Sequence, residues 1–263
     1  MSDVNTPLPA ASKVPLVNQM LLSDIGYALR MGLRDYLRAP FMGLFFAHVY
    51  VVGGWLMYLF LIVNEHVWYA IPITVGFPLV GPFLAVGLYE VSRRLEMGKG
   101  WTRSDIFGVI WRQKDRQLPS MSWVIIVYFL FWSFFAHMLF ALFLGPTAFT
   151  NVSSSYAYLL EPEGVVMLLV GTAFGAIFAL VLFSLTVVSL PLLLDKNLDF
   201  VTAMLTSIAV VRKNPRVMLT WGLTIAGLTF AGMVPLLSGL FLVLPVLGHA
   251  TWHIYRRALT PQD

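Results

Sequence analysis

The sequence of 263 residues contains no cysteine. Disulfide bonds, thiolate metal sites and thiol catalysis are therefore excluded. Charge is also scarce, because Asp, Glu, Lys and Arg make up 11% of the residues, whereas soluble domains carry roughly 25%. With 59% hydrophobic residues, the chain has too few polar groups to cover a surface that faces water. Lipid must be its main solvent.

The sequence instead contains long apolar stretches. There are six of them, at residues 41–63, 69–92, 122–144, 164–194, 217–233 and 236–255. A helix needs about 20 residues to cross about 30 Å of hydrocarbon. The sequence therefore predicts an all-α polytopic membrane protein with six transmembrane helices. The fourth stretch is longer than one crossing needs, so we expect it to tilt, to kink near Pro191 or to project beyond the lipid.

Lys and Arg are absent from every second gap between these stretches. All 17 lie before residue 40, between residues 93 and 121, between residues 195 and 216, or after residue 255. None lies at residues 64–68, 145–163 or 234–239. Because cytoplasmic loops carry the excess of Lys and Arg, both termini are expected on the cytoplasmic face of the membrane.

The formal net charge of +4 does not indicate binding to nucleic acid, because the basic residues gather at a membrane face. Anionic lipid head groups attract each such residue by about 1 kcal/mol, so membrane lipids are the expected partners. The residues predicted to contact head groups are Arg30, Arg34, Arg38, Arg112, Lys114, Arg212, Lys213, Arg256 and Arg257.

The basic gaps begin in similar ways. An offset of 175 residues aligns Asp24 with Asp199 and Pro40 with Pro215, and the middle gap repeats Ser-Asp-Ile before Pro119. Asp is a common N-cap, and Pro ends a helix. We predict three hairpins of two spans, each preceded by a cytoplasmic amphipathic helix that begins at such an Asp. Ordinary connecting loops with chance similarity are the alternative.

This plan divides the chain into a flexible cytoplasmic tail at residues 1–19, a single six-span domain at residues 20–258 and a short cytoplasmic tail at residues 259–263. Within the domain, small residues repeat every four positions, as Gly171, Gly175 and Ala179 in the fourth stretch and as Gly222 and Ala226 in the fifth. Such residues let helices approach closely. We expect them to pack within the chain, with a face between two copies as the alternative.

Histidine is the main candidate for chemistry, because the six stretches contain no Lys, Arg or Asp. At 1.5 Å per residue, His48 lies about 12 Å and His249 about 10 Å from the cytoplasmic end, so both are expected in one layer. Two facing imidazoles suit haem iron, and His249 with His253 on one helix face suits a metal ion. The alternatives are hydrogen bonds between helices for His48 and His249, and an interfacial position for His253.

Four segments together resemble a bacterial integral membrane family of unknown function, and the resemblance covers residues 20–258. They are residues 81–84 (Gly-Pro-Phe-Leu), 87–90 (Gly-Leu-Tyr-Glu) with Arg93 and Arg94, 191–195 (Pro-Leu-Leu-Leu-Asp) and 248–253 (Gly-His-Ala-Thr-Trp-His). The resemblance implies the topology and a bacterial cytoplasmic (inner) membrane, but no activity.

Two labels attach to that resemblance. Members of the family are sometimes labelled as subunit I of cytochrome c oxidase, which needs many more spans and more than the five histidines present here. The three-hairpin plan is also similar to the membrane domain of some glycerophosphodiester phosphodiesterases, but this sequence has no soluble phosphodiesterase domain. Neither activity is carried over.

Three functions remain open, and none is catalytic. The first is an accessory, scaffold or assembly protein that docks on a membrane-protein partner, with the respiratory chain as one setting. The second is a transporter or channel for a lipidic or neutral solute, suggested by the repeats and by Pro72, Pro78 and Pro82, which kink or break the second span. The third is a haem- or metal-binding membrane protein.

Overall fold

The computed structural model describes residues 12–63, 70–100, 102–144 and 161–262 of the chain, and most of them are helical. The expected gaps at residues 64–68 and 145–160 lie outside the described residues. In chain order the elements are β1 (Leu16–Val17), α1 (Leu22–Arg38), α2 (Pro40–Val63), α3 (Ala70–Glu96), α4 (Arg103–Gln113), α5 (Leu118–Leu144), α7 (Pro162–Thr186), α8 (Ser189–Asp195), α9 (Phe200–Lys213), α10 (Pro215–Met233), α11 (Leu240–Ala258) and β2 (Leu259–Thr260).

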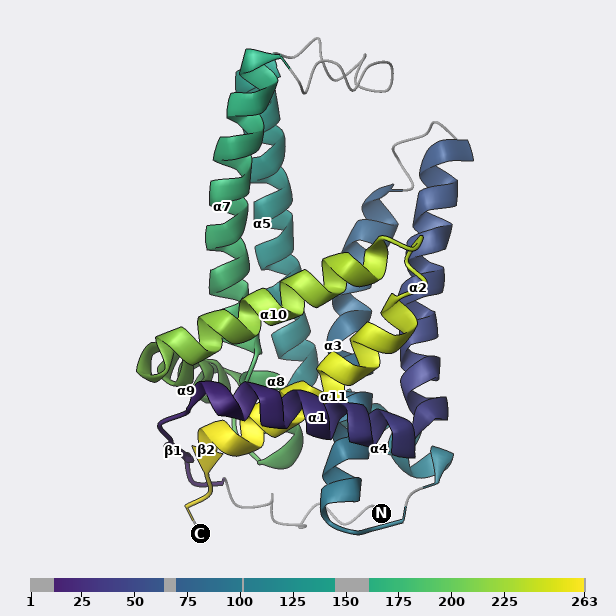
Figure 1. The fold of residues 1–263 in the computed structure, drawn as a ribbon, viewed down its shortest axis with the longest axis vertical. Helices are drawn as coiled ribbons and strands as arrows, with labels where there is room; N and C mark the ends of the chain where they lie inside the picture. The colour runs from purple at the N-terminus through teal and green to yellow at the C-terminus, as the bar shows by residue number, and fades with distance from the viewer. Residues whose placement is uncertain (1–11, 64–69, 101, 145–160, 263) are drawn as a thin grey trace, which may run out of the picture.

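Each of the six apolar stretches forms a helix, which confirms the all-α class. Figure 1 shows the pair α2 and α3 and the pair α5 and α7 standing upright, with α10 and α11 crossing obliquely. The turn between α10 and α11 lies well below the far ends of α5 and α7 (Figure 1). The last two helices therefore do not run parallel to the others.

The described residues do not confirm all six predicted crossings. Within the described part of the chain, three helices are long and apolar enough to cross a membrane: Leu118–Phe143, Pro162–Asp195 and Pro215–Met233. A fourth is added if Leu22–Arg38 and Pro40–Leu56, which meet at an angle of 101°, count as one bent span. Helix α11 is not among them, because it carries Arg256 and Arg257 in its last turn.

The long fourth stretch and the proline-rich second one behave differently. Residues 187–188 interrupt the helix and separate α7 from α8, which contains Pro191. By contrast, α3 is continuous through Pro72, Pro78 and Pro82. A helix broken at these prolines, which would have favoured a transporter, is therefore not observed.

The three helices predicted before the hairpins are present as α1, α4 and α9, but their caps differ. Asp199 is the N-cap of α9, and its carboxylate accepts a hydrogen bond from the Thr202 backbone N–H at 2.8 Å. Asp24 lies three residues inside α1 and accepts from the backbone N–H of Leu21, the N-cap residue. The prediction of an Asp N-cap is thus confirmed for Asp199 and wrong for Asp24.

Two sharp corners of the chain share one geometry. Ala39 lies between α1 and α2 with φ −133° and ψ 52°, and Asn214 lies between α9 and α10 with φ −125° and ψ 52°. Each is followed by a proline, Pro40 or Pro215, that begins the next helix, as a fixed φ and a missing N–H favour. The middle gap has no such corner, since Pro119 lies inside α5.

The best-packed part of the molecule is the end where α1, α3, α8, α9 and α11 meet, which we call the base. Trp252, Ile254 and Leu192 are almost fully buried there. β1 pairs antiparallel with β2, so that Val17 lies opposite Leu259. This short sheet places parts of both predicted tails beside each other, and it lies at the base of the molecule (Figure 1). Residues 1–11 lie outside the described residues.

Candidate functional site

Helix α1 lies directly against α11, and a glycine makes this approach possible. A Cβ atom placed on Gly32 would lie 2.6 Å from the carbonyl oxygen of Val246 and 2.7 Å from the backbone nitrogen of Ala250. Asp35 follows three residues later, about one helical turn, and so faces the same neighbour. The sequence thereby brings a carboxylate to the face of α11 that carries the histidines.

Asp35 pairs with His253. The two atoms Oδ2 and Nε2 are 2.7 Å apart, and both side chains are buried. The ring of Tyr27 meets that of His253 edge-on, with centroids 6.4 Å apart. Burial by itself would raise the pKa of the Asp35 carboxyl, but the hydrogen bond and the attraction to His253 hold that pKa below its ordinary value. Asp35 is therefore a carboxylate at neutral pH.

His249 lies one turn before His253 and is completely buried. Its Nδ1 atom lies 2.8 Å from the hydroxyl oxygen of Ser92 on α3. Among the described residues, the other ring nitrogen, Nε2, has no hydrogen-bond partner. Three helices, α1, α3 and α11, thus contribute to one buried polar cluster, which we define as Asp35, Ser92, His249 and His253.

The predicted haem pair is not what the structure brings together. His48 is exposed on α2, and its ring centroid lies 6.2 Å from that of Phe241, whereas His249 is buried beside Ser92. No group of three or more His, Asp or Glu side chains in the described part of the chain is placed to hold a metal ion. Metal binding by His249 and His253, and haem binding by His48 and His249, remain predictions.

Ion pairs surround this cluster at the base. Glu90 accepts hydrogen bonds from Arg93 at 2.9 Å and Arg94 at 2.7 Å, and Arg256 of α11 reaches Glu96 at 3.0 Å. Sequence reasoning missed the pair between Arg256 and Glu96, because these residues lie 160 positions apart in the chain. The only local signal was the spacing of Glu90 from Arg93 and Arg94, which favours pairing on one helix face.

The basic residues predicted to contact head groups divide into two sets. Arg257 pairs with Asp24 at 2.6 Å and Arg256 with Glu96, so these two are already bound within the chain. Lys213 donates to the carbonyl oxygen of Val17. Arg30, Arg38, Arg112 and Arg212 are exposed and form no ion pair, side-chain hydrogen bond or cation–π contact in the described part of the chain, whereas Arg34 lies 3.7 Å from Asp35 and Lys114 lies over the ring of Trp111.

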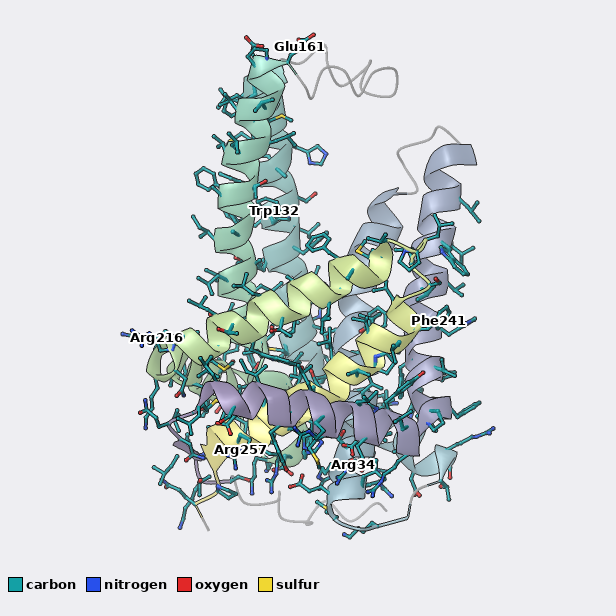
Figure 2. The ribbon with its side chains drawn as sticks, viewed as in Figure 1. Arg34, Trp132, Glu161, Arg216, Phe241 and Arg257 are labelled. Carbon is teal, nitrogen blue, oxygen red and sulfur yellow. The ribbon has the colours of Figure 1, made fainter. Side chains whose placement is uncertain are left out.

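A second feature lies away from the polar cluster. An apolar groove of about 1070 Å³ runs between α5, α7 and α10, and Trp132 and Thr172 carry the only polar side-chain atoms in its lining. Trp132 lies at mid-height of the α5 and α7 pair (Figure 2). Several lining side chains stay largely exposed, among them Leu223 at 73% and Phe230 at 70%. The groove is therefore open along its side.

The repeated small residues form much of this groove. Gly171, Gly175 and Ala179 line it from α7, and Gly222 and Ala226 from α10. A Cβ atom on Gly171 would have no neighbour within 4 Å, and one on Gly222 would meet Phe183 only at 3.7 Å. Close helix packing is therefore not observed at Gly171 and Gly222, whereas a Cβ atom on Gly175 would contact the Trp132 ring of α5 at 3.4 Å. The small side chains leave space between the helices.

The comparisons with known proteins bear on the family alone. No curated protein and no solved structure matched this sequence. One family model did match, and it covers α3, α4, α5, α7 and α8 together with the segments that join them. The expected resemblance to an integral membrane family of unknown function is thereby confirmed: residues 70–195 match the family described as predicted integral membrane protein (DUF2189).

Proposed function

We propose that this integral membrane protein is non-catalytic and binds a lipidic molecule in the groove between α5, α7 and α10. The observation that carries the proposal is the groove itself, a volume of about 1070 Å³ with an almost wholly apolar lining. Small-molecule sites usually enclose about 300–1,000 Å³. The volume is therefore ample for an extended apolar chain.

The surroundings of the groove favour a lipidic occupant. All three helices that line it are among the candidate membrane spans, so lipid is their immediate neighbour. The open side lets a molecule enter from the bilayer without passing through water. The polar cluster lies elsewhere, and its Ser92 and His249 are fully buried, which supports a role in holding helices together rather than catalysis.

Substitutions on α10 test the proposal. Gly222 lines the groove and Gly227 does not, and an added Cβ has no backbone neighbour at either position. We expect Gly222→Leu to fill the groove and to lower the amount of lipid that copurifies in mild detergent, measured by native mass spectrometry, at least fivefold. Gly227→Leu is the matched control and should retain lipid as the wild type does. Equal retention by both variants would contradict the proposal.

We further propose a bacterial inner-membrane location with both termini in the cytoplasm. Arg34 and Arg257 lie at the end of the molecule that carries β1 and β2, and Glu161 lies at the opposite end (Figures 1 and 2). This arrangement supports the positive-inside orientation. We also propose that α10 and α11 enter and leave the membrane on one face without crossing it, so that α2, α3, α5 and α7 supply four crossings and both termini share a face.

The second candidate function is that of an accessory or assembly protein. The open groove supports it, because small residues on α7 and α10 also suit a helix from a membrane-protein partner. The same mass measurement separates the two candidates. A protein that leaves the complex in Gly222→Leu but not in Gly227→Leu would favour the accessory role over lipid binding.

A further inference from the structure

We infer that the ligand of the groove is an anionic phospholipid of the cytoplasmic leaflet, with an acyl chain along α7 and α10 and its phosphate between Arg212 and Arg216. This inference rests on the proposed function and names the class of ligand. The observation behind it is a pair of exposed arginines at one end of an apolar groove, neither of which forms an ion pair with another described residue.

Arg216 is placed at the cytoplasmic end of the groove by the register of α10. Leu219 and Leu223, which line the groove, follow it by three and seven residues and therefore share its helix face. Arg216 is the second residue of α10 and is exposed, and its side chain points away from that end of the helix (Figure 2). A charged group bound there would sit directly beside the apolar path.

The corner that carries both arginines is rigid. Asn214 is 3% exposed, its Oδ1 accepts from the Met20 backbone N–H at 2.8 Å, and its Nδ2 donates to the Asn18 carbonyl oxygen at 2.9 Å. Arg212 lies in the last turn of α9, two residues before this asparagine, and Arg216 lies in the first turn of α10, two residues after it. The two guanidinium groups are thus attached to a fixed turn rather than to a loose loop.

Neither arginine is neutralised within the described part of the chain. The described ion pairs use other cations, and the nearest carboxylate in the sequence, Asp199, caps the far end of α9. A guanidinium matches phosphate oxygens with two parallel hydrogen bonds. The first turn of α10 adds free backbone N–H groups and the positive end of the helix dipole. The corner therefore favours a phosphate.

The apolar groove indicates which kind of phosphate compound binds at this corner. Helix α9 contacts α5, α7 and α10, so it closes the cytoplasmic end of the space that these three helices enclose. A ligand with its phosphate at the end of α9 has its nonpolar part next to Leu219 and Phe183, both of which line the groove. A soluble phosphate would use the cations but gain nothing from this apolar surface. A phospholipid uses both.

The test compares two lipids and three variants of the full chain in detergent, by native mass spectrometry during titration with dioleoyl phosphatidylglycerol or dioleoyl phosphatidylcholine. The wild type should bind the anionic lipid more tightly. Arg216→Gln should weaken that binding about fivefold, which corresponds to about 1 kcal/mol per basic side chain, and the double change with Arg212→Gln should weaken it further. Lys99→Gln, which changes an exposed basic residue that has no ion pair in the described chain and is not among the predicted head-group contacts, is the control and should have no effect.

The outcomes separate the two proposals. Equal binding of both lipids, unaltered by Arg216→Gln but lost in Gly222→Leu, would overturn the anionic specificity and leave the groove as a lipid site. Equal weakening by Lys99→Gln would also overturn it, since the attraction would then belong to the whole basic surface. No lipid on the wild type, or a dimer that covers the groove, would overturn the proposed function itself.

Discussion

The close approach of α1 to α11 is tested by replacing a single hydrogen atom with a methyl group. In Gly32→Ala the new Cβ would lie 2.6 Å from the Val246 carbonyl oxygen, 2.7 Å from the Ala250 nitrogen and 2.8 Å from the Ala250 Cβ. Two of these atoms are backbone, so no flexible side chain can move aside. The two helices must separate, and the Asp35–His253 pair one turn further on must separate with them.

The magnitude follows from two opposing effects. Overpacking of a tight contact costs about 1–3 kcal/mol, and contacts below 3 Å with backbone atoms place this site at the upper end. Replacing glycine by alanine within a helix stabilises the helix by about 1 kcal/mol, which offsets part of this cost. We therefore expect Gly32→Ala to lower the free energy of unfolding by about 2 kcal/mol. For a chain of this size, such a change lowers Tm by roughly 4–8 °C.

The control lies on the same helix. A Cβ atom on Gly26 would have no neighbour within 4 Å, so Gly26→Ala should gain about 0.5–1 kcal/mol from helix propensity alone. Both variants are measured by thermal unfolding in one mild detergent, followed by tryptophan fluorescence. If Gly32→Ala is as stable as Gly26→Ala, α1 does not pack closely on α11, and Asp35 of α1 does not belong to the buried polar cluster.

Three other substitutions test separate features. Asp35→Ala removes the partner of buried His253 and should cost about 2–3 kcal/mol in thermal unfolding, because a hydrogen bond to a charged group is lost; an unchanged Tm would contradict the pairing. Ser238→Cys, in a chain without native cysteine, should resist an impermeant maleimide added outside intact cells, whereas Glu163→Cys should react; external labelling of both would contradict the oblique hairpin. Asp199→Ala should cost about 1 kcal/mol through loss of the N-cap of α9, and an unchanged Tm would show that the cap contributes nothing.

Local patterns in the sequence predict the helices well. Apolar length predicts where α2, α3, α5 and α10 run, and Pro40 and Pro215 predict where the chain turns. These signals are local, since a proline fixes its own φ and removes its own N–H group wherever it lies. The same logic fails for Asp24, because an Asp stabilises a helix both as the N-cap and three residues inside it.

The contacts of the site depend on distant segments and escape such patterns. Asp35 and His253 are 218 residues apart, and Ser92 and His249 are 157 residues apart. Counting residues from the cytoplasmic end predicted His48 and His249 at a similar depth in the membrane. This count does not determine which way each ring faces. The same ambiguity applies to Gly171: a small residue permits close packing, and it equally leaves space when no helix comes near.

The positions of the polar contacts explain why a groove persists in so apolar a molecule. Hydrogen bonds and ion pairs join α1, α3, α8 and α11 at the base, where burial is greatest. Helix α7 packs on α5 and α9, while α10 packs on α9 and α11, so the two walls of the groove are fixed from below and from opposite sides. In water, exposed apolar walls would be driven together, but in lipid this force vanishes because acyl chains are as apolar as leucine. The small residues on the facing walls of the groove therefore gain little free energy by coming into contact. The groove stays open, and an apolar chain from the membrane fills it.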